Sequence, residues 1–243
     1  MRLATLSEFL EGELLANVPS TALQMKNIGQ ILAEMDVALK GFDHKGAHRL
    51  LAWDVAQAAS CRSMLPEKGT TDNESRWDLV RNRLDCFVIE IQPRLRDLRQ
   101  QVLHADFNPY NILMDVNDFQ KVSGILDLGD MVYTQLINNV AIAATYQVNS
   151  QDPLNTVIEL VTAYHDVLPL KSEEIDLLYD LIIIRLCMAV TITEFRARQY
   201  PENSKYILKN TATAWRGLER LSTISREEAS VVFRMACNFP SRR

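Results

Sequence analysis

Apolar residues recur at helical spacing over most of this chain, and this pattern predicts a mainly helical protein. The first predicted helix starts after Pro19 and stops at Gly41. Its apolar positions are Leu23, Ile28, Ile31, Leu32, Met35 and Leu39. The same spacing predicts further helices over residues 53–63, 76–98, 137–148, 153–168, 172–199, 203–222 and 225–236.

The period changes between residues 102 and 130, where short runs rich in β-branched residues replace the helical pattern. These runs are "NILMDV" and "KVSGILDL", and "NDFQ" joins them. Two such runs with a short polar connection predict a β-hairpin. The predicted fold class is therefore α+β and mainly helical, with one hairpin inserted among the helices.

The predicted hairpin brings polar side chains together at one end. Asn111 opens its first strand and Asp127 closes its second, and antiparallel pairing places these two positions side by side. Amide and carboxylate oxygens are hard ligands that suit Mg²⁺, which takes one or two protein ligands and completes its shell with water and phosphate oxygens. Asp106 enters the same corner five residues before Asn111. A carboxylate there can accept a hydroxyl proton.

A loop without chemistry is the competing interpretation of this cluster. Asp and Asn are common turn residues, so an isolated D-x-x-x-x-N is more often a turn than a catalytic loop. His104 before the motif, the hairpin after it and the ending "ILDLGD" together reverse that balance. We therefore interpret the cluster as a phosphoryl-transfer site.

The segments "HADFNPYNILM" and "GILDLGDMVY" resemble the aminoglycoside phosphotransferase-like kinase family, and more closely its hydroxylysine kinase-like branch. The segments "AIAATY", "FDHKGAHRLLAWD" and "NTATAWRGLERL" also resemble that branch, and the opening "TLSEFLEGELL" resembles the end of the small lobe and the hinge, so the similarity runs from about residue 2 to 222. The resemblance implies a catalytic role for Asp106 and metal ligation by Asn111 and Asp127. It also implies that His104 braces the catalytic loop. Asp130 is expected to position the loop or the substrate, with a solvated turn residue as an equal alternative.

The resemblance further implies the C-terminal lobe of a protein-kinase-like fold with most of the small lobe missing. Residues 1–15 are expected to be a remnant of the small lobe and hinge, and 16–243 the helical lobe with the catalytic loop and hairpin at 102–130. No two of the eight glycines form a G-x-G-x-x-G loop, and the first lysine, Lys26, falls inside the first predicted helix. The face that a small lobe would cover is expected to favour association with another molecule.

The implied activity is transfer of the γ-phosphate of ATP or GTP to a hydroxyl of an amino compound, such as hydroxylysine or an aminoglycoside, with Mg²⁺ as the metal. The first hypothesis is therefore a small-molecule kinase lobe that is incomplete as this chain. Two alternatives stay open: a binding module that has lost transfer activity, and part of a longer kinase in which Met1 is an internal residue.

Two positions depart from the pattern of the family. Ala105 stands where a glycine is usual, which strains the loop if that position needs a positive φ. Asn139 in "INNVAIA" stands where an aspartate is usual, so a charge that would anchor the helix to the catalytic loop is lost.

Composition and charge narrow the class of partners. The chain is 47% hydrophobic and 23% charged, as ordinary soluble proteins are, and its net charge of −5 argues against a nucleic-acid partner. The N-terminus lacks a signal-peptide pattern and the most apolar run carries Asp180 and Arg185, so a cytoplasmic protein without a membrane partner is expected. The four cysteines form no CxxC motif and are predicted to be scattered, buried thiols.

The acceptor site is expected where the helical lobe faces the hairpin, and four residues are candidates for it. They are Trp53, Asp54, Arg185 and Trp215. His44 and His48 in "FDHKGAHR" are assigned a structural or substrate-facing role, because no carboxylate set accompanies them as metal ligands.

Overall fold

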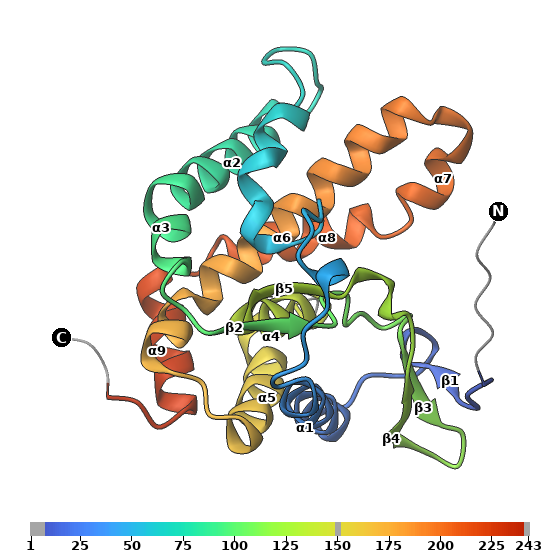
Figure 1. Ribbon diagram of the computed structural model, residues 1–243. Helices are drawn as coiled ribbons and strands as arrows, with labels where there is room; N and C mark the ends of the chain where they lie inside the picture. Colours follow the sequence, from blue (N-terminus) through green and yellow to red (C-terminus); the bar gives the residue numbers. More distant parts are fainter. Residues whose placement is uncertain (1–7, 149–151, 241–243) are drawn as a thin grey trace.

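The computed structural model describes residues 8–148 and 152–240, and the fold is mainly helical, as predicted (Figure 1). The helices are α1 Ala22–Ala38, α2 Glu74–Cys86, α3 Gln92–Leu95, α4 Leu136–Thr145, α5 Pro153–Val167, α6 Ser172–Gln199, α7 Ser204–Ile207, α8 Thr211–Leu221 and α9 Arg226–Ala236. The strands are β1 Glu13–Leu14, β2 Gln100–Leu103, β3 Ile112–Asp115, β4 Asp118–Ile125 and β5 Val132–Gln135. The first seven residues of the predicted small-lobe remnant lie outside the described ranges.

Helices α4 and α6 form the centre of the core. All ten residues of α4 are buried, and α6 packs against α4, α8, α9 and the 3₁₀ helix Val55–Met64. A helix that is apolar on all sides belongs inside the protein, where burial of its side chains supplies most of its stability. Helix α4 also carries two fully buried polar side chains, Asn138 and Asn139.

The predicted hairpin is confirmed, and its connection is shorter than expected. Strands β3 and β4 pair antiparallel from Ile112 opposite Ile125 to Asp115 opposite Asp118, so Val116 and Asn117 alone form the turn. Strand β1 adds to the free edge of β3. The residues "DFQ", predicted as loop, therefore belong to β4.

A second sheet of two strands was not predicted. Strand β2 pairs antiparallel with β5, with Leu103 opposite Val132 and Gln100 opposite Gln135. The run "VYTQ" is too short for a clear period of two, and the helical pattern that follows it at Leu136 masks its start. This pairing fixes the entry to the catalytic loop, because Leu103 immediately precedes His104.

Helix α1 packs against strand β4 of the hairpin. Its first turn is closed by a capping box in which Thr21 and Gln24 exchange hydrogen bonds. Gln24 Nε2 also donates to the backbone oxygen of Phe119 at 2.6 Å, and Asn27 Nδ2 donates to that of Gln120 at 2.7 Å. Strand β4 is therefore tied to α1 through backbone acceptors.

Two predicted helices are interrupted. The helix expected over 76–98 changes at Phe87 into a π-helical turn that ends at Ile91, because Pro93 lacks the N–H that a regular continuation requires. The helix expected over 203–222 breaks between Ile207 and Thr211. The break places Lys209 Nζ 4.0 Å from the ring centre of Tyr110 in the catalytic loop.

No helix in the described part of the chain is long and apolar enough to cross a membrane. All four cysteines are free, and three of them are buried while Cys86 is half-buried. The association expected at the predicted small-lobe face stays a prediction; Phe9 is exposed there.

Candidate active site

The hairpin brings Asn111 and Asp127 to the same corner, as predicted from its geometry. Both lie just outside the strands, since β3 begins at Ile112 and β4 ends at Ile125. The backbone N–H of Leu126 donates to the oxygen of Asn111 at 2.8 Å. Asp127 therefore directly follows the residue that pairs with Asn111.

Asp106 and Asn111 are in direct contact. Asn111 Nδ2 donates to Asp106 Oδ2 at 2.8 Å and to the backbone oxygen of Asp106 at 2.9 Å. These two bonds occupy the amide nitrogen, so the remaining polar atom of the side chain, Oδ1, is the one free to accept or to ligate. The catalytic loop therefore turns back on itself and presents an amide oxygen beside a carboxylate.

Asp127 adopts the left-handed conformation, with φ of 60° and ψ of 78°. Its Oδ1 accepts a hydrogen bond from the N–H of Gly129 at 3.0 Å, which closes the 3₁₀ turn Leu128–Asp130. Asp tolerates this conformation better than most residues because its short polar side chain bonds locally. The second carboxylate oxygen stays available at an exposed position.

His104 connects the catalytic loop to the end of the hairpin. Its fully buried ring accepts from the N–H of Asp106 through Nδ1 at 3.2 Å and donates from Nε2 to the oxygen of Leu126 at 2.9 Å. The two backbone partners fix the tautomer, because an N–H can only donate and a carbonyl can only accept. The position of this histidine fits the predicted bracing role.

The two departures from the pattern of the family meet in one network. Ala105 has φ of 62°, so the position does require the left-handed region, at a cost of about 1–2 kcal/mol for a residue with a Cβ. The N–H of Ala105 donates to Asn139 Oδ1 at 3.2 Å, so the asparagine keeps the link between helix and loop. Asn139 Nδ2 in turn donates to Asp36 Oδ1 at 2.8 Å, and the Tyr164 hydroxyl donates to Asp36 Oδ2 at 2.8 Å. The acid of this network is thus Asp36 on α1, which accepts from Asn139 and which sequence reasoning did not identify.

Burial raises the pKa of Asp106 above its ordinary value. Hydrogen bonds from Asn108 and Asn111 and the positive charge of Arg185 lower this pKa, whereas the nearby charge of Asp130 raises it. A carboxyl with a raised pKa is the kind of group that takes a proton from a reacting hydroxyl most effectively near neutral pH. Asp130, half-buried in the turn after Asp127, therefore interacts electrostatically with Asp106 across the corner.

Three of the four acceptor candidates lie beside this corner. Arg185 Nη2 is 3.9 Å from Asp106 Oδ1, and its Nη1 donates to the backbone oxygen of Trp53 at 2.5 Å. Its guanidinium also lies over the Trp53 ring at 4.9 Å. The buried carboxylate of Asp54 accepts from Thr134 at 2.9 Å, and its pKa is raised by burial.

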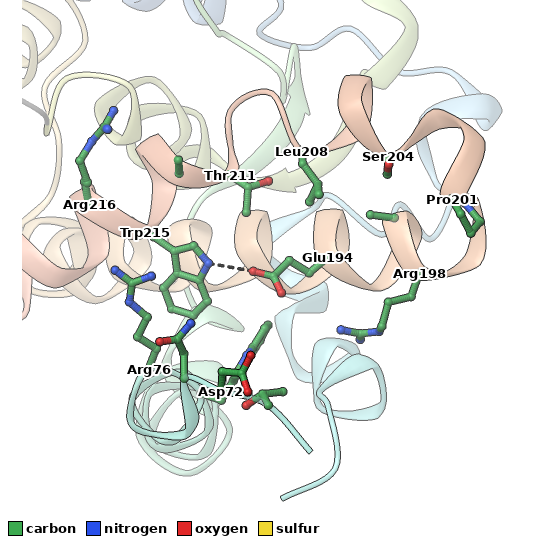
Figure 2. A pocket seen from close by; sticks show the side chains of 15 residues that line it. Asp72, Arg76, Glu194, Arg198, Pro201, Ser204, Leu208, Thr211, Trp215 and Arg216 are labelled. Carbon is green, nitrogen blue, oxygen red and sulfur yellow. Dashed lines mark hydrogen bonds between the residues drawn. The ribbon is translucent and has the colours of Figure 1, made fainter. Parts of the chain in front are cut away.

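Trp215 belongs to a different part of the molecule. It lines a cleft of about 940 Å³ between the start of α2, the end of α6 and the α7–α8 region, and its Nε1 donates to Glu194 at 2.9 Å (Figure 2). Glu194 follows Arg185 by nine residues on α6. At about 100° per residue this spacing puts the two side chains on opposite faces of the helix. Trp215 also packs edge-to-face on Trp77, with ring centres 5.2 Å apart.

No cluster of three or more His, Cys, Asp or Glu side chains within residues 8–148 and 152–240 is arranged to hold a metal ion. The predicted ligands form a different set, one amide oxygen and one carboxylate. Such a pair of hard oxygen donors fits Mg²⁺, whose remaining positions are normally filled by water and phosphate.

The chain belongs to the APH family of phosphotransferase enzymes, whose family model matches residues 2–174. It is 27% identical over 224 residues to a hydroxylysine kinase from Mus musculus, an alignment that covers 88% of this chain and 59% of the relative. A hydroxylysine kinase from Bos taurus is 26% identical over 242 residues, with 95% of this chain and 64% of the relative covered. The chain thus spans about six tenths of the length of these relatives.

Solved structures share the fold. The GDP complex of aminoglycoside 2′-phosphotransferase-IIIa superposes with a TM-score of 0.57 at 15% identity, over 88% of this chain and 69% of the other. The amicoumacin kinase hAmiN, in complex with AMP-PNP, Ca²⁺ and Ami, gives a TM-score of 0.56 at 14% identity, over 84% of this chain and 60% of the other. The predicted family and fold class are therefore confirmed. The domain boundary at residues 15–16 stays a prediction.

Proposed function

We propose that this chain carries the phosphoryl-transfer site of a small-molecule kinase, which moves the γ-phosphate of ATP or GTP to a hydroxyl of an amino compound such as hydroxylysine. The single observation that carries the proposal is the contact of Asp106 with Asn111 at the corner where Asp127 follows the hairpin. The family match supports it, and so does the sequence similarity to the two hydroxylysine kinases described above.

Each residue of the corner has a proposed role. Asp106 accepts the proton of the acceptor hydroxyl as the new P–O bond forms and the bond to the β-phosphate oxygen breaks, which releases ADP or GDP. Asn111 Oδ1 and the Asp127 carboxylate would hold Mg²⁺, which supplies positive charge to the phosphate oxygens when bound. His104 and Asp130 position the loop and the turn on which these groups stand.

A binding module without transfer activity is the second candidate. The observation in its favour is that no two of the eight glycines of the given sequence form a G-x-G-x-x-G phosphate loop. Phosphoryl transfer requires the triphosphate to be held as well as the metal, and water to be excluded. We therefore expect weak metal-dependent nucleotide binding and little or no turnover from this chain alone.

Calorimetric titration with ATP and with GTP, each with and without Mg²⁺, tests the proposal. Binding that requires Mg²⁺ and disappears in Asp127→Ala supports a kinase-type nucleotide site, and the two titrations compare the nucleotides. Absence of binding under all four conditions would refute it. A parallel phosphorylation assay with hydroxylysine separates the two candidates, because robust transfer would exclude the inactive module.

A further inference from the structure

The segment Asp43–Asp54, from here on the 43–54 segment, contains the motif "FDHKGAHRLLAWD" without its first residue. It leaves the end of α1 and passes the β2–β5 sheet before it enters the 3₁₀ helix Val55–Met64 (Figure 1). None of the catalytic roles proposed above uses it. Its contacts nevertheless reach the site at two places, Gly129 through Arg49 and Arg185 through Trp53.

Strand β5 fixes the segment at two points. The His48 ring stacks on the Tyr133 ring with centres 4.8 Å apart and 28° between their planes, and His48 Nε2 lies 2.5 Å from Asp43 Oδ1. Six residues further on, Asp54 Oδ1 accepts from the Thr134 hydroxyl at 2.9 Å. Because Tyr133 and Thr134 are neighbours on one strand, the chain between His48 and Asp54 is held at both ends.

Arg49 lies between these two points and reaches the turn that carries the acids. Its Nη2 donates to the backbone oxygen of Gly129, which lies between Asp127 and Asp130. No other hydrogen bond or ion pair joins its guanidinium to a residue of the described ranges, and the side chain is exposed. A guanidinium has five N–H donors in a planar fork, so most of its capacity for carboxylate or phosphate is unused.

A cation at this corner offsets negative charge of the protein and of its substrates. Asp106, Asp127 and Asp130 concentrate negative charge there, and any phosphate or carboxylate of a substrate adds more. Arg185 lies next to Asp106, but it is buried and already donates to the oxygen of Trp53. Arg49 is the exposed arginine anchored at the turn itself, with donors free for an incoming oxyanion.

We propose that Arg49 is a substrate-binding residue that contacts an oxyanion at the turn Leu128–Asp130, either a phosphate oxygen of the nucleotide or the carboxylate of an amino-acid acceptor. This inference rests on the proposed function. The His48–Tyr133 stack acts as a positioning contact, because it sets the backbone from which Arg49 extends.

The test measures binding, so that it does not depend on turnover. Wild type, Arg49→Gln and Arg49→Lys are titrated with Mg²⁺–tripolyphosphate, with hydroxylysine and with the same amino alcohol lacking its carboxylate. Arg198→Gln is the matched control, since Arg198 is also exposed and also donates to a backbone oxygen, that of Met64 at 3.1 Å. Thermal unfolding of each variant verifies that it is folded.

Arg49→Gln should weaken binding of one oxyanion probe about ten-fold or more, which is the size expected for loss of charge-assisted hydrogen bonds, and Arg49→Lys should recover part of it. Weaker binding of tripolyphosphate assigns the contact to the nucleotide. Weaker binding of hydroxylysine, with the decarboxylated amine unaffected, assigns it to the acceptor. Unchanged binding of all probes by Arg49→Gln, while Asp127→Ala loses tripolyphosphate, would overturn this inference alone and leave Arg49 as a clip between loop and turn. Wild type that binds neither oxyanion probe would overturn this inference, and absence of Mg²⁺-dependent binding of ATP and GTP as well would overturn the proposed function.

Discussion

Asn139 joins the catalytic loop to a buried acid: its Oδ1 accepts from the N–H of Ala105 at 3.2 Å and its Nδ2 donates to Asp36 at 2.8 Å. The amide is thus acceptor to one partner and donor to the other. Asn139→Asp would replace the donor by a carboxylate facing Asp36, and we expect a loss of about 3 kcal/mol or more in the free energy of unfolding.

The exchange of the two residues should restore the network. In the double variant Asp36→Asn with Asn139→Asp, the carboxylate introduced at position 139 can accept from the N–H of Ala105 and from the amide introduced at position 36. The oxygen of that amide can still accept from the Tyr164 hydroxyl. Urea unfolding of both single variants and the double variant measures the coupling between positions 36 and 139. The double variant should be more stable than either single one. Simple addition of the two single losses would mean that Asp36 and Asn139 do not act as a pair.

The charge state of Asp36 predicts a dependence of stability on pH. Burial raises its pKa from 3.8 to about 7, against hydrogen bonds from Tyr164 and Asn139 that lower it. Between these two pH values the folded protein binds a proton that the unfolded chain has released, so the contribution of Asp36 to stability falls as pH rises. At about 1.36 kcal/mol per pKa unit the change is on the order of 4 kcal/mol.

The unfolding free energies of wild type and Asp36→Asn, measured from pH 4 to 7.5, isolate this contribution. Arg99 and Glu174, which lie beyond Tyr164 and pair with each other at 2.6 Å, are present in both proteins and cancel. The difference, wild type minus variant, should decrease with rising pH. A difference that stays constant or increases would show that Asp36 is not the titrating group.

His104 should contribute to stability as well as to loop position. His104→Ala leaves the N–H of Asp106 and the oxygen of Leu126 without their buried partner, at about 1–3 kcal/mol for each group. Urea unfolding should show the loss, and amide exchange should become faster across residues 104–111. His44→Ala, an exposed histidine that caps the short Lys45–Ala47 helix, is the control and should change stability by about 0.5 kcal/mol or less. Equal stability of His104→Ala and wild type would remove the bracing role.

The packing of α1 on α5 gives a prediction for the fold itself. A Cβ at Gly29 would lie 2.2 Å from the backbone oxygen of Leu160, so Gly29→Ala must push the helices apart. We expect a loss of at least about 1–3 kcal/mol by urea unfolding, since backbone cannot move aside as a flexible side chain does. Gln30→Ala, on the exposed side of the same helix, should be close to neutral. A neutral Gly29→Ala would contradict the close approach of the two helices.

The sequence predicted the helical lobe and the hairpin because both patterns are local. The period of 3.6 over α1, α5 and α6, and the change of period at β3 and β4, are visible without knowledge of tertiary contacts. Strand β5 was missed because its four residues are defined by pairing with β2, which lies about thirty residues earlier in the sequence.

The same distinction applies to the site. Asp106 and Asn111 were predicted from their spacing, and Asp127 from the geometry of the hairpin. Asp36 was missed because it meets Asn139 only through packing of α1 on α4. Its signal in the sequence is a lone acid among the apolar positions at the end of the first helix. Arg49 was missed because its contact, Gly129, lies eighty residues later in the sequence. The only sequence feature that indicated a role for it is the motif "FDHKGAHR", for which the sequence offered no explanation.

The central claim is that an amide oxygen and a carboxylate at the end of one hairpin hold a divalent cation together with nucleotide phosphates. Electron paramagnetic resonance of Mn²⁺, used in place of Mg²⁺ in the presence of ADP, directly measures binding of the cation–nucleotide complex to the protein. Wild type and the control Asp118→Asn, which removes an acid from the opposite end of the same hairpin, should bind the Mn²⁺–nucleotide complex equally. Asp127→Asn keeps a side chain that tolerates the left-handed backbone, and it should weaken this binding about ten-fold or more, as should Asn111→Ala. Binding of the complex by both variants with the affinity of wild type would place the metal elsewhere and contradict the account.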